Sequence, residues 1–486
     1  MTWNELRSPT YLEFRQMVRR YRPSDLVPAL AGYSAAVALK RADREPRDPR
    51  RDTPWVISAI ARDSVLYGNE HRHGRVGEGT LPELIWAFNK TGGEVEGQSL
   101  GEMMTSLTYE QFPYRESEFE EVSRIHALFE DPTLGPTLDW TEVFGMDLRD
   151  AVRASFVLRA WVTHNGGRFD PALLEQANMQ EVFHRAAPRE QIETLARTLT
   201  TTIDEARVSN AEVPTLPRHL QRYAFNPLTA RPLLDLGDRG IWSPQTMLVD
   251  RALFPANLYY RGIAHWGSRF AEVLGARTEA YVGRQMRLIA GEDLHGEIEY
   301  RQGKDRQKSV DWIWVTPKAV ILVECKSARL TLGARAGDAS LPTLTERYLT
   351  HARQQLDRTA ALIGARTPPF NQFPADRPIV GIAVTSEPFY LGNSTLDEYG
   401  TRSTIPSLVV SLRDLEYWVC MPATEAADTL LGILNDPERR TWALHQALGE
   451  LRDLGHNPIL DAAWREYDFI EQRDHRGQAS TDPVTA

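Results

Sequence analysis

The chain has 486 residues, of which 42% are hydrophobic and 25% charged, as expected of a folded protein with two or three domains. Its formal net charge of -10 excludes a nonspecific basic coat for nucleic acid, although a local basic groove stays compatible with it. Two cysteines, Cys325 and Cys420, are too few for a disulfide framework or a Cys₄ zinc site, and no apolar run approaches the length of a membrane span.

The start of the chain lacks the basic-then-apolar order of a signal peptide. Together with the absence of a long apolar run, this predicts a cytoplasmic protein with no membrane partner.

Residues 1–220 are predicted to form a mainly α-helical N-terminal domain. Apolar residues recur there at spacings of three and four, for example over 148–162 and 189–203. Breaks at 41–54 and 164–167 are predicted to be exposed loops, and no repeat of fixed period occurs. The sequence assigns this domain no role, and a sensor or regulatory role is the expectation.

Residues 221–262 are rich in Pro and Gly and lack a sustained helical spacing. This segment is predicted to be a connector. Helical spacing then resumes over 264–289, with Gly275 and Gly283 as weak points. We predict strands at 297–302, 309–316 and 319–327, with a basic turn at 303–308 between the first two. A helix at 344–363 and strands at 378–387 and 407–412 follow.

This order predicts an α/β domain over 263–420, with a mixed sheet flanked by helices. A helical extension over 421–471 and a disordered tail over 472–486 complete the expected organisation.

The strand AVILVECKS, residues 319–327, carries the strongest chemical signal. Its side chains alternate, so Glu324 and Lys326 share one face of a strand that is apolar on both faces. Asp311 is likewise embedded in an apolar run one strand earlier. A hairpin between the two strands brings Asp311 near Glu324, and a hard divalent cation relieves the repulsion between two such carboxylates. An ion pair between Glu324 and Lys326 at a sheet edge, and a turn cap at Asp311, are the structural alternatives.

Asp311, followed after twelve residues by Glu324-Cys325-Lys326, resembles the catalytic motif of the PD-(D/E)xK nuclease superfamily, which has the restriction-endonuclease-like fold. Val310 stands where the motif's proline would be. The resemblance implies a Mg²⁺ site, in which Mn²⁺ can substitute, formed by Asp311, Glu324 and the backbone carbonyl of Cys325, with Lys326 assisting catalysis.

In that superfamily a helix before the first strand often supplies another carboxylate. The stretch LGARTEAYVG is similar to it and points to Glu279, with Glu272, nearly two turns earlier on the same face, as the substitute. A helix after the motif presents a Gln in some branches, which Gln354 or Gln355 matches. A solvated helix face explains these residues as well.

The basic residues next to the expected site are candidates for phosphate contacts, and a solvated hairpin tip is their other explanation. They are Arg301, Lys304, Arg306 and Lys308. His71 and His73, although spaced as neighbouring metal ligands can be, are better explained by an exposed polar loop.

We therefore expect a metal-dependent nuclease that hydrolyses phosphodiester bonds in DNA. Its arrangement is similar to that of nuclease effectors of prokaryotic antiviral defence, and assembly into a homo-oligomer is left open. Two alternatives remain: an inactive nuclease-fold protein that binds nucleic acid or a protein partner, and a helical interaction scaffold.

Overall fold

The structure, a computed structural model, describes residues 8–42, 53–91, 99–176, 179–327, 329–386, 389–399, 402–449 and 454–467. The protein is a mixed α/β protein, as expected. The predicted tail 472–486 and most of the predicted loop 41–54 lie outside the described residues. None of the described helices has both the length and the apolar character that a membrane span requires.

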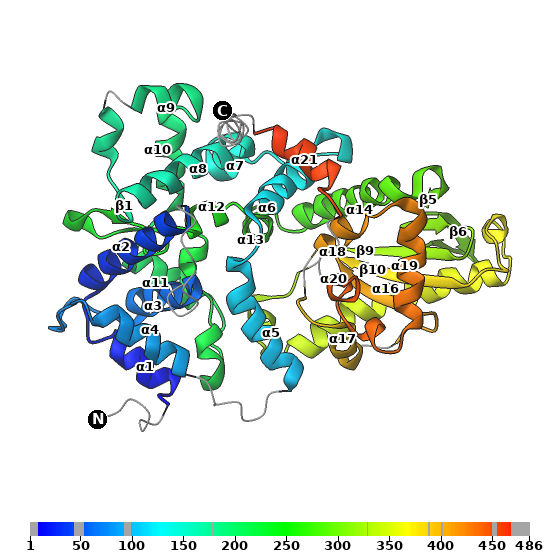
Figure 1. The fold of residues 1–486 in the computed structure, drawn as a ribbon, viewed down its shortest axis with the longest axis horizontal. Helices are drawn as coiled ribbons and strands as arrows, with labels where there is room; N and C mark the ends of the chain where they lie inside the picture. Colours follow the sequence, from blue (N-terminus) through cyan, green and yellow to red (C-terminus); the bar gives the residue numbers. More distant parts are fainter. Residues whose placement is uncertain are drawn as a thin grey trace, which may run out of the picture.

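The N-terminal part is built from helices, drawn in blue to green in Figure 1. Three of its helices begin with a capping box, at Thr10, Ser99 and Thr202, in which a Glu three residues on returns the hydrogen bond. The helices are α1 (Tyr11–Val18), α2 (Pro23–Ala42), α3 (Pro54–Tyr67), α4 (Thr80–Lys90), α5 (Leu100–Gln111), α6 (Glu118–Ile125), α7 (Thr141–Phe144), α8 (Leu148–His164), α9 (Met179–Arg185), α10 (Arg189–Leu199) and α11 (Ile203–Ala211).

The predicted helix over 148–162 is confirmed as α8, and the one over 189–203 ends earlier, at Leu199. Its last residues form a strand, β2 (Thr200–Thr202), because the capping box at Thr202 starts the next helix.

The segment expected to be a connector, 221–262, is itself folded. It contributes β3 (Leu233–Asp235), β4 (Ile241–Trp242), α12 (Leu248–Arg251) and most of α13 (Pro255–Trp266). With β1 (Arg168–Phe169) and β2, its strands form a small sheet in the order β1-β4-β3-β2. These residues are thus built into the helical part of the molecule and do not form a free linker.

A five-stranded mixed sheet forms the centre of the second part, shown at the right of Figure 1. Its order is β11-β10-β9-β8-β5; β5, β8 and β9 are antiparallel, whereas β9, β10 and β11 are parallel. The strands are β5 (Leu294–Gly296), β8 (Trp312–Val315), β9 (Val320–Lys326), β10 (Ile379–Thr385) and β11 (Ser407–Ser411). The last four confirm the strands predicted at 309–316, 319–327, 378–387 and 407–412.

The prediction around residue 300 was wrong in two respects. Residues 299–302 do not join the main sheet; β6 (Glu299–Gln302) pairs with β7 (Asp305–Lys308) in a separate ribbon, so the supposed turn 303–308 is mostly strand. The third antiparallel strand of the sheet is β5. The ribbon shows strand-like alternation because Tyr300 packs against Phe370 while its neighbours are exposed.

Helices cover both faces of the sheet. One face, with Trp314, Ile321 and Val323, packs with α14 (Ser268–Ala290) and α18 (Leu412–Trp418). The other face, with Ile313 and Leu322, packs against α16 (Leu341–Gly364). The shorter helices α15 (Leu332–Arg335) and α17 (Asn393–Tyr399) lie in the connections that follow β9 and β10.

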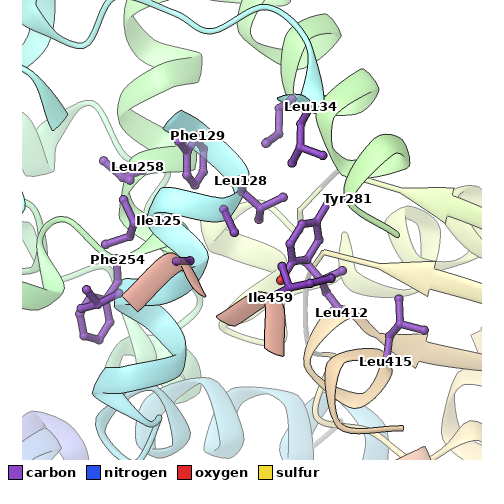
Figure 2. Close-up of a cluster of buried hydrophobic side chains, with 14 of the residues drawn as sticks. Ile125, Leu128, Phe129, Leu134, Phe254, Leu258, Tyr281, Leu412, Leu415 and Ile459 are labelled. Carbon is purple, nitrogen blue, oxygen red and sulfur yellow. The ribbon is translucent and has the colours of Figure 1, made fainter. Parts of the chain in front are cut away.

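The C-terminal helices α19 (Ala423–Asn435), α20 (Leu444–Ala447) and α21 (Pro458–Arg465) confirm the expected helical extension. Helix α21 returns to the N-terminal part and packs against α6, where the ring centroids of Phe119 and Trp464 lie 5.1 Å apart. Figure 2 shows part of the apolar cluster to which both helices contribute. Phe254 from the former connector and Leu412 from the α/β part belong to the same apolar cluster. The largest core is therefore shared between the two parts.

Candidate metal and active site

The two strands with the predicted motif are adjacent and antiparallel. Trp312 pairs with Val323, so continuing the register by one residue places Asp311 opposite Glu324. The backbone N–H of Cys325 donates a hydrogen bond of 2.6 Å to Oδ2 of Asp311. The structure thus brings Asp311 to the end of β9 that carries the Glu-Cys-Lys tripeptide.

Glu324 is buried, with 4% of its surface exposed, and its two carboxylate oxygens differ. Lys326 donates from Nζ to Oε1 at 2.6 Å. Oε2 is buried and has no hydrogen-bond partner among the described residues. An unpartnered buried carboxylate oxygen is unfavourable unless something else binds it.

The electrostatics of the pair reflect this crowding. Burial, and next the repulsion from Asp311, raise the pKa of Glu324 to about 7, against the opposing effect of Lys326. Burial also raises the pKa of Asp311, although the hydrogen bond from Cys325 and the charge of Lys326 act against it. Lys326 therefore compensates the two carboxyl groups only in part.

Glu279 reaches the same group of charges from α14. Burial, followed by repulsion from Asp311 and Glu297, raises its pKa to about 7. Its backbone carbonyl accepts a hydrogen bond of 3.0 Å from Nε1 of Trp312, the residue after Asp311. Glu272, the substitute considered from the sequence, is exposed to solvent. The structure therefore favours Glu279 of the two.

Glu297, between β5 and β6, was missed by the sequence analysis. Its negative charge raises the pKa of Asp311, Glu279 and Glu324. It also forms an ion pair of 2.8 Å with Lys308. In the predicted strand at 297–302, Glu297 shares a face with Glu299, so nothing in the sequence distinguishes it.

Helix α16 supports the strand that carries Asp311 through two side chains. Gln355 donates to the carbonyl of Ser309 at 3.3 Å, and Thr359 Oγ1 accepts from the backbone N–H of Val310 at 3.1 Å. Gln354 is exposed. Of the two glutamines proposed for this helix, Gln355 therefore lies next to the site, and Thr359 is a further supporting residue that the sequence did not indicate.

The four predicted phosphate-contacting residues are exposed on the β6–β7 ribbon, and Arg301 pairs with Arg306 across it. Lys304 lies in its turn, whereas Lys308 is held by Glu297. Arg358 of α16 donates to Gln307 at 3.1 Å and ties the ribbon to this helix. Of the four basic residues, Lys308 is the one that the electrostatics place beside the carboxylates, because its charge acts on Glu279.

His71 and His73 are exposed in the loop before α4, as expected. Throughout the described ranges, no three His, Cys, Asp or Glu side chains are grouped closely enough to hold a metal ion by themselves. Mg²⁺, however, is commonly bound by one or two carboxylates, with water and substrate completing its shell. The hard oxygen donors of Asp311 and Glu324, and the unpartnered Oε2 of Glu324, fit such an ion.

Comparison of the chain with protein-family models, curated proteins and solved structures finds no significant match.

Proposed function

We propose that the protein is a Mg²⁺-dependent nuclease of the PD-(D/E)xK type that hydrolyses phosphodiester bonds in DNA. The element order supports a restriction-endonuclease-like core: helix α14, the antiparallel strands β5, β8 and β9, helix α16, and the parallel strand β10. The β6–β7 ribbon is then an insertion between the first two strands of this core.

The observation that carries the proposal is the placement of Asp311 opposite Glu324, with Lys326 bonded to one Glu324 oxygen and the other left without a partner. A purely structural ion pair needs no second carboxylate beside it. Removing two carboxylates from water and placing them together is unfavourable unless a cation compensates them.

Asp311, Glu324 and the backbone carbonyl of Cys325 would hold Mg²⁺. Glu279 would contact the ion through bound water, since no three acidic side chains among the described residues are close enough to ligate one ion directly. When bound, the ion would supply Lewis-acid polarisation of a phosphoryl oxygen and a lowered pKa of bound water. Lys326 positions the attacking water or stabilises the negative charge that develops on the phosphate.

The β6–β7 ribbon orients the substrate in this proposal. Arg301 and Arg306 present two cationic side chains on one face of the ribbon, and the ribbon follows shortly after Glu297 in the chain. Contacts of this kind neutralise phosphates without reading the base sequence.

The test is incubation of the full chain with plasmid, linear and single-stranded DNA in Mg²⁺, Mn²⁺ or EDTA. We expect cleavage in either metal and none in EDTA. Glu324→Gln and Lys326→Ala should each lower the rate by about 100-fold or more, because each removes a group that acts on the reacting phosphate.

Two matched variants control for nonspecific effects. Lys318→Ala removes an exposed lysine before the opposite end of β9, and Glu272→Gln removes the exposed carboxylate on α14 as a control for Glu279→Gln. Both controls should cleave at the wild-type rate. Identical products from the wild type, Glu324→Gln and Lys326→Ala would refute the proposal, and DNA binding without cleavage would identify a binding protein instead.

A further inference from the structure

A second candidate site lies away from the carboxylates, in a cavity of about 440 Å³ between the two parts of the molecule. Its walls come from α3, α5, α12 and α13, the segment 222–226, and α15. Cavities of this size are typical of small-molecule sites. Aromatic rings and arginine side chains dominate its lining.

Two of the lining arginines are neutralised within the protein. Arg222 forms a bidentate ion pair with Glu110, with two hydrogen bonds of 2.8 Å. Arg62 forms an ion pair of 2.9 Å with Asp63. Glu116, the other lining carboxylate, is also engaged, because it forms an ion pair of 3.0 Å with Arg413. The carboxylates around the cavity therefore already form ion pairs within the protein.

Arg251 and Arg261 differ from these. Arg251 is 8% exposed and has no ion pair or side-chain hydrogen bond in the part of the chain that the structure describes. Nε of Arg261 is buried without a hydrogen-bond partner, and burial together with Arg231 lowers the pKa of Arg261 to about 10. Arg261 donates to the carbonyl of Ala230. Arg251 lies in the field of Glu116 and Asp250, but these carboxylates are paired with other arginines. Buried guanidinium groups that have no carboxylate of their own indicate a place for an anion.

The aromatic rings lie beside these cations. The Arg251 guanidinium lies 5.7 Å from the ring of Tyr114 and 5.3 Å from that of Phe254. Arg335 lies 5.0 Å from the ring of Tyr109 and 4.9 Å from that of Tyr260. Aromatic faces stack on planar heterocycles, and arginine binds phosphate oxygens through two parallel hydrogen bonds.

We propose that this cavity binds a free nucleoside phosphate, whose base stacks on the aromatic walls and whose phosphate pairs with Arg251 and Arg261. A simple inorganic anion would leave the aromatic walls without a role, and an uncharged heterocycle would leave the two arginines uncompensated. One molecule that carries a planar base and a phosphate would complement both the aromatic walls and the two arginines.

The cavity is connected to the segment that leaves the catalytic strand. Arg335 follows Lys326 by nine residues, and Tyr260 on the opposite wall donates to the carbonyl of Leu330 at 2.7 Å. A ligand held between α13 and α15 therefore braces residues 329–336, directly after β9. Binding is consequently expected to change the nuclease rate, and this second step alone rests on the proposed function.

The test measures binding of AMP, ATP, GTP, adenosine and inorganic phosphate to the full chain by titration calorimetry. We expect the nucleotides to bind more tightly than adenosine or phosphate. Arg251→Gln should weaken nucleotide binding by about tenfold or more, since it removes a charge-assisted hydrogen bond. Arg189→Gln, on an exposed arginine outside the cavity lining, should leave the affinity unchanged.

Arg335→Gln provides a second variant if Arg251→Gln does not fold, and it should weaken binding in the same direction. Glu324→Gln should bind nucleotide as the wild type does, so a failure of the nuclease proposal leaves this test intact. Three outcomes would overturn the site: no nucleotide binding at millimolar concentration, equal affinity for phosphate and nucleotide, or Arg251-dependent binding of oligonucleotides alone.

Discussion

The two oxygens of Glu324 experience different surroundings, and the difference has consequences for stability. Oε1 is neutralised by Lys326, whereas Oε2 is buried without a partner and faces the field of Asp311. In the metal-free protein this arrangement is destabilising. Groups held unfavourably in this way concentrate at sites where a ligand compensates them.

We predict that Glu324→Gln melts at a higher temperature than the wild type in EDTA, because the amide carries no charge to repel Asp311. Addition of Mg²⁺ should raise the melting temperature of the wild type and have a smaller effect on Glu324→Gln or Asp311→Asn. Differential scanning fluorimetry in EDTA and in Mg²⁺ measures both effects. Equal Mg²⁺-induced shifts in all three proteins would mean that no ion binds between these carboxylates.

The sequence was sufficient to propose Asp311, Glu324 and Lys326, since charged residues at the end of a strand that is apolar on both faces need a partner. It was not sufficient to find Glu297. That residue approaches the others only because the chain leaves the main sheet after Gly296 and starts the β6–β7 ribbon. A change of sheet leaves no mark in the local alternation of side chains.

Helix α14 approaches the sheet most closely at Gly283. A Cβ atom at this position would lie 2.1 Å from Cζ2 of Trp312, whereas a Cβ at Gly275 of the same helix would be 3.6 Å from Oγ of Ser327. Trp312 cannot easily move, because its Nε1 donates to the carbonyl of Glu279 and the Arg287 guanidinium lies 4.9 Å from its ring. Gly283 thus allows the contact between α14 and β8 that positions Glu279.

We predict opposite effects for alanine at the two glycines. Gly275→Ala should stabilise the protein by up to about 1 kcal/mol, because alanine favours the helix and has room there. Gly283→Ala should destabilise it, since overpacking of about 1–3 kcal/mol outweighs the same gain. Urea unfolding of both variants measures the free energies. A stabilised Gly283→Ala protein would show that α14 can move away from β8 without loss.

The sequence predicted four helices, at 148–162, 189–203, 264–289 and 344–363, and four strands of the main sheet, because their apolar patterns are long enough to have a clear period. It missed β5, whose three residues Leu294, His295 and Gly296 carry no pattern. The helix expected at 264–289 begins instead at Ser268, after Gly267 with φ 58° separates it from α13. Gly275 and Gly283 were expected to break or bend this helix, but the helix continues through both positions.

A buried group of charges joins the helical part to the α/β part. Arg124 of α6 donates to Glu121 on its own helix and to both carboxylate oxygens of Glu416 on α18. Tyr281 of α14 donates to the same Glu416 at 2.8 Å. The group therefore connects α6 and α18 to the helix that carries Glu279.

We predict that Arg124→Met destabilises the protein by about 3–5 kcal/mol, because it leaves Glu416 buried without its cation, whereas Glu121 keeps its ion pair with Arg413. The double variant Arg124→Met/Glu416→Gln should recover part of this loss. Arg189→Met, which removes an exposed ion pair with Glu175 and Glu193, should leave the melting temperature unchanged and serves as the control. Equal melting temperatures for Arg124→Met and the wild type would contradict a stabilising role for this group.

The sequence did not predict that the two parts share a core. An apolar helix face indicates that a helix is covered on that side, but it carries no information on which other helix covers it. The apolar face of α6 therefore gave no sign that it packs with α21, more than 300 positions later in the chain.

The return of α21 to α6 affects how the protein is made. Phe119 of α6 packs against Trp464 of α21, which is translated 345 residues later, or on the order of 20 to 70 s at ordinary elongation rates. During that interval the nascent polypeptide exposes part of its largest apolar cluster at the ribosome. Chaperones that bind emerging chains are consequently expected to hold this protein until synthesis has passed α21.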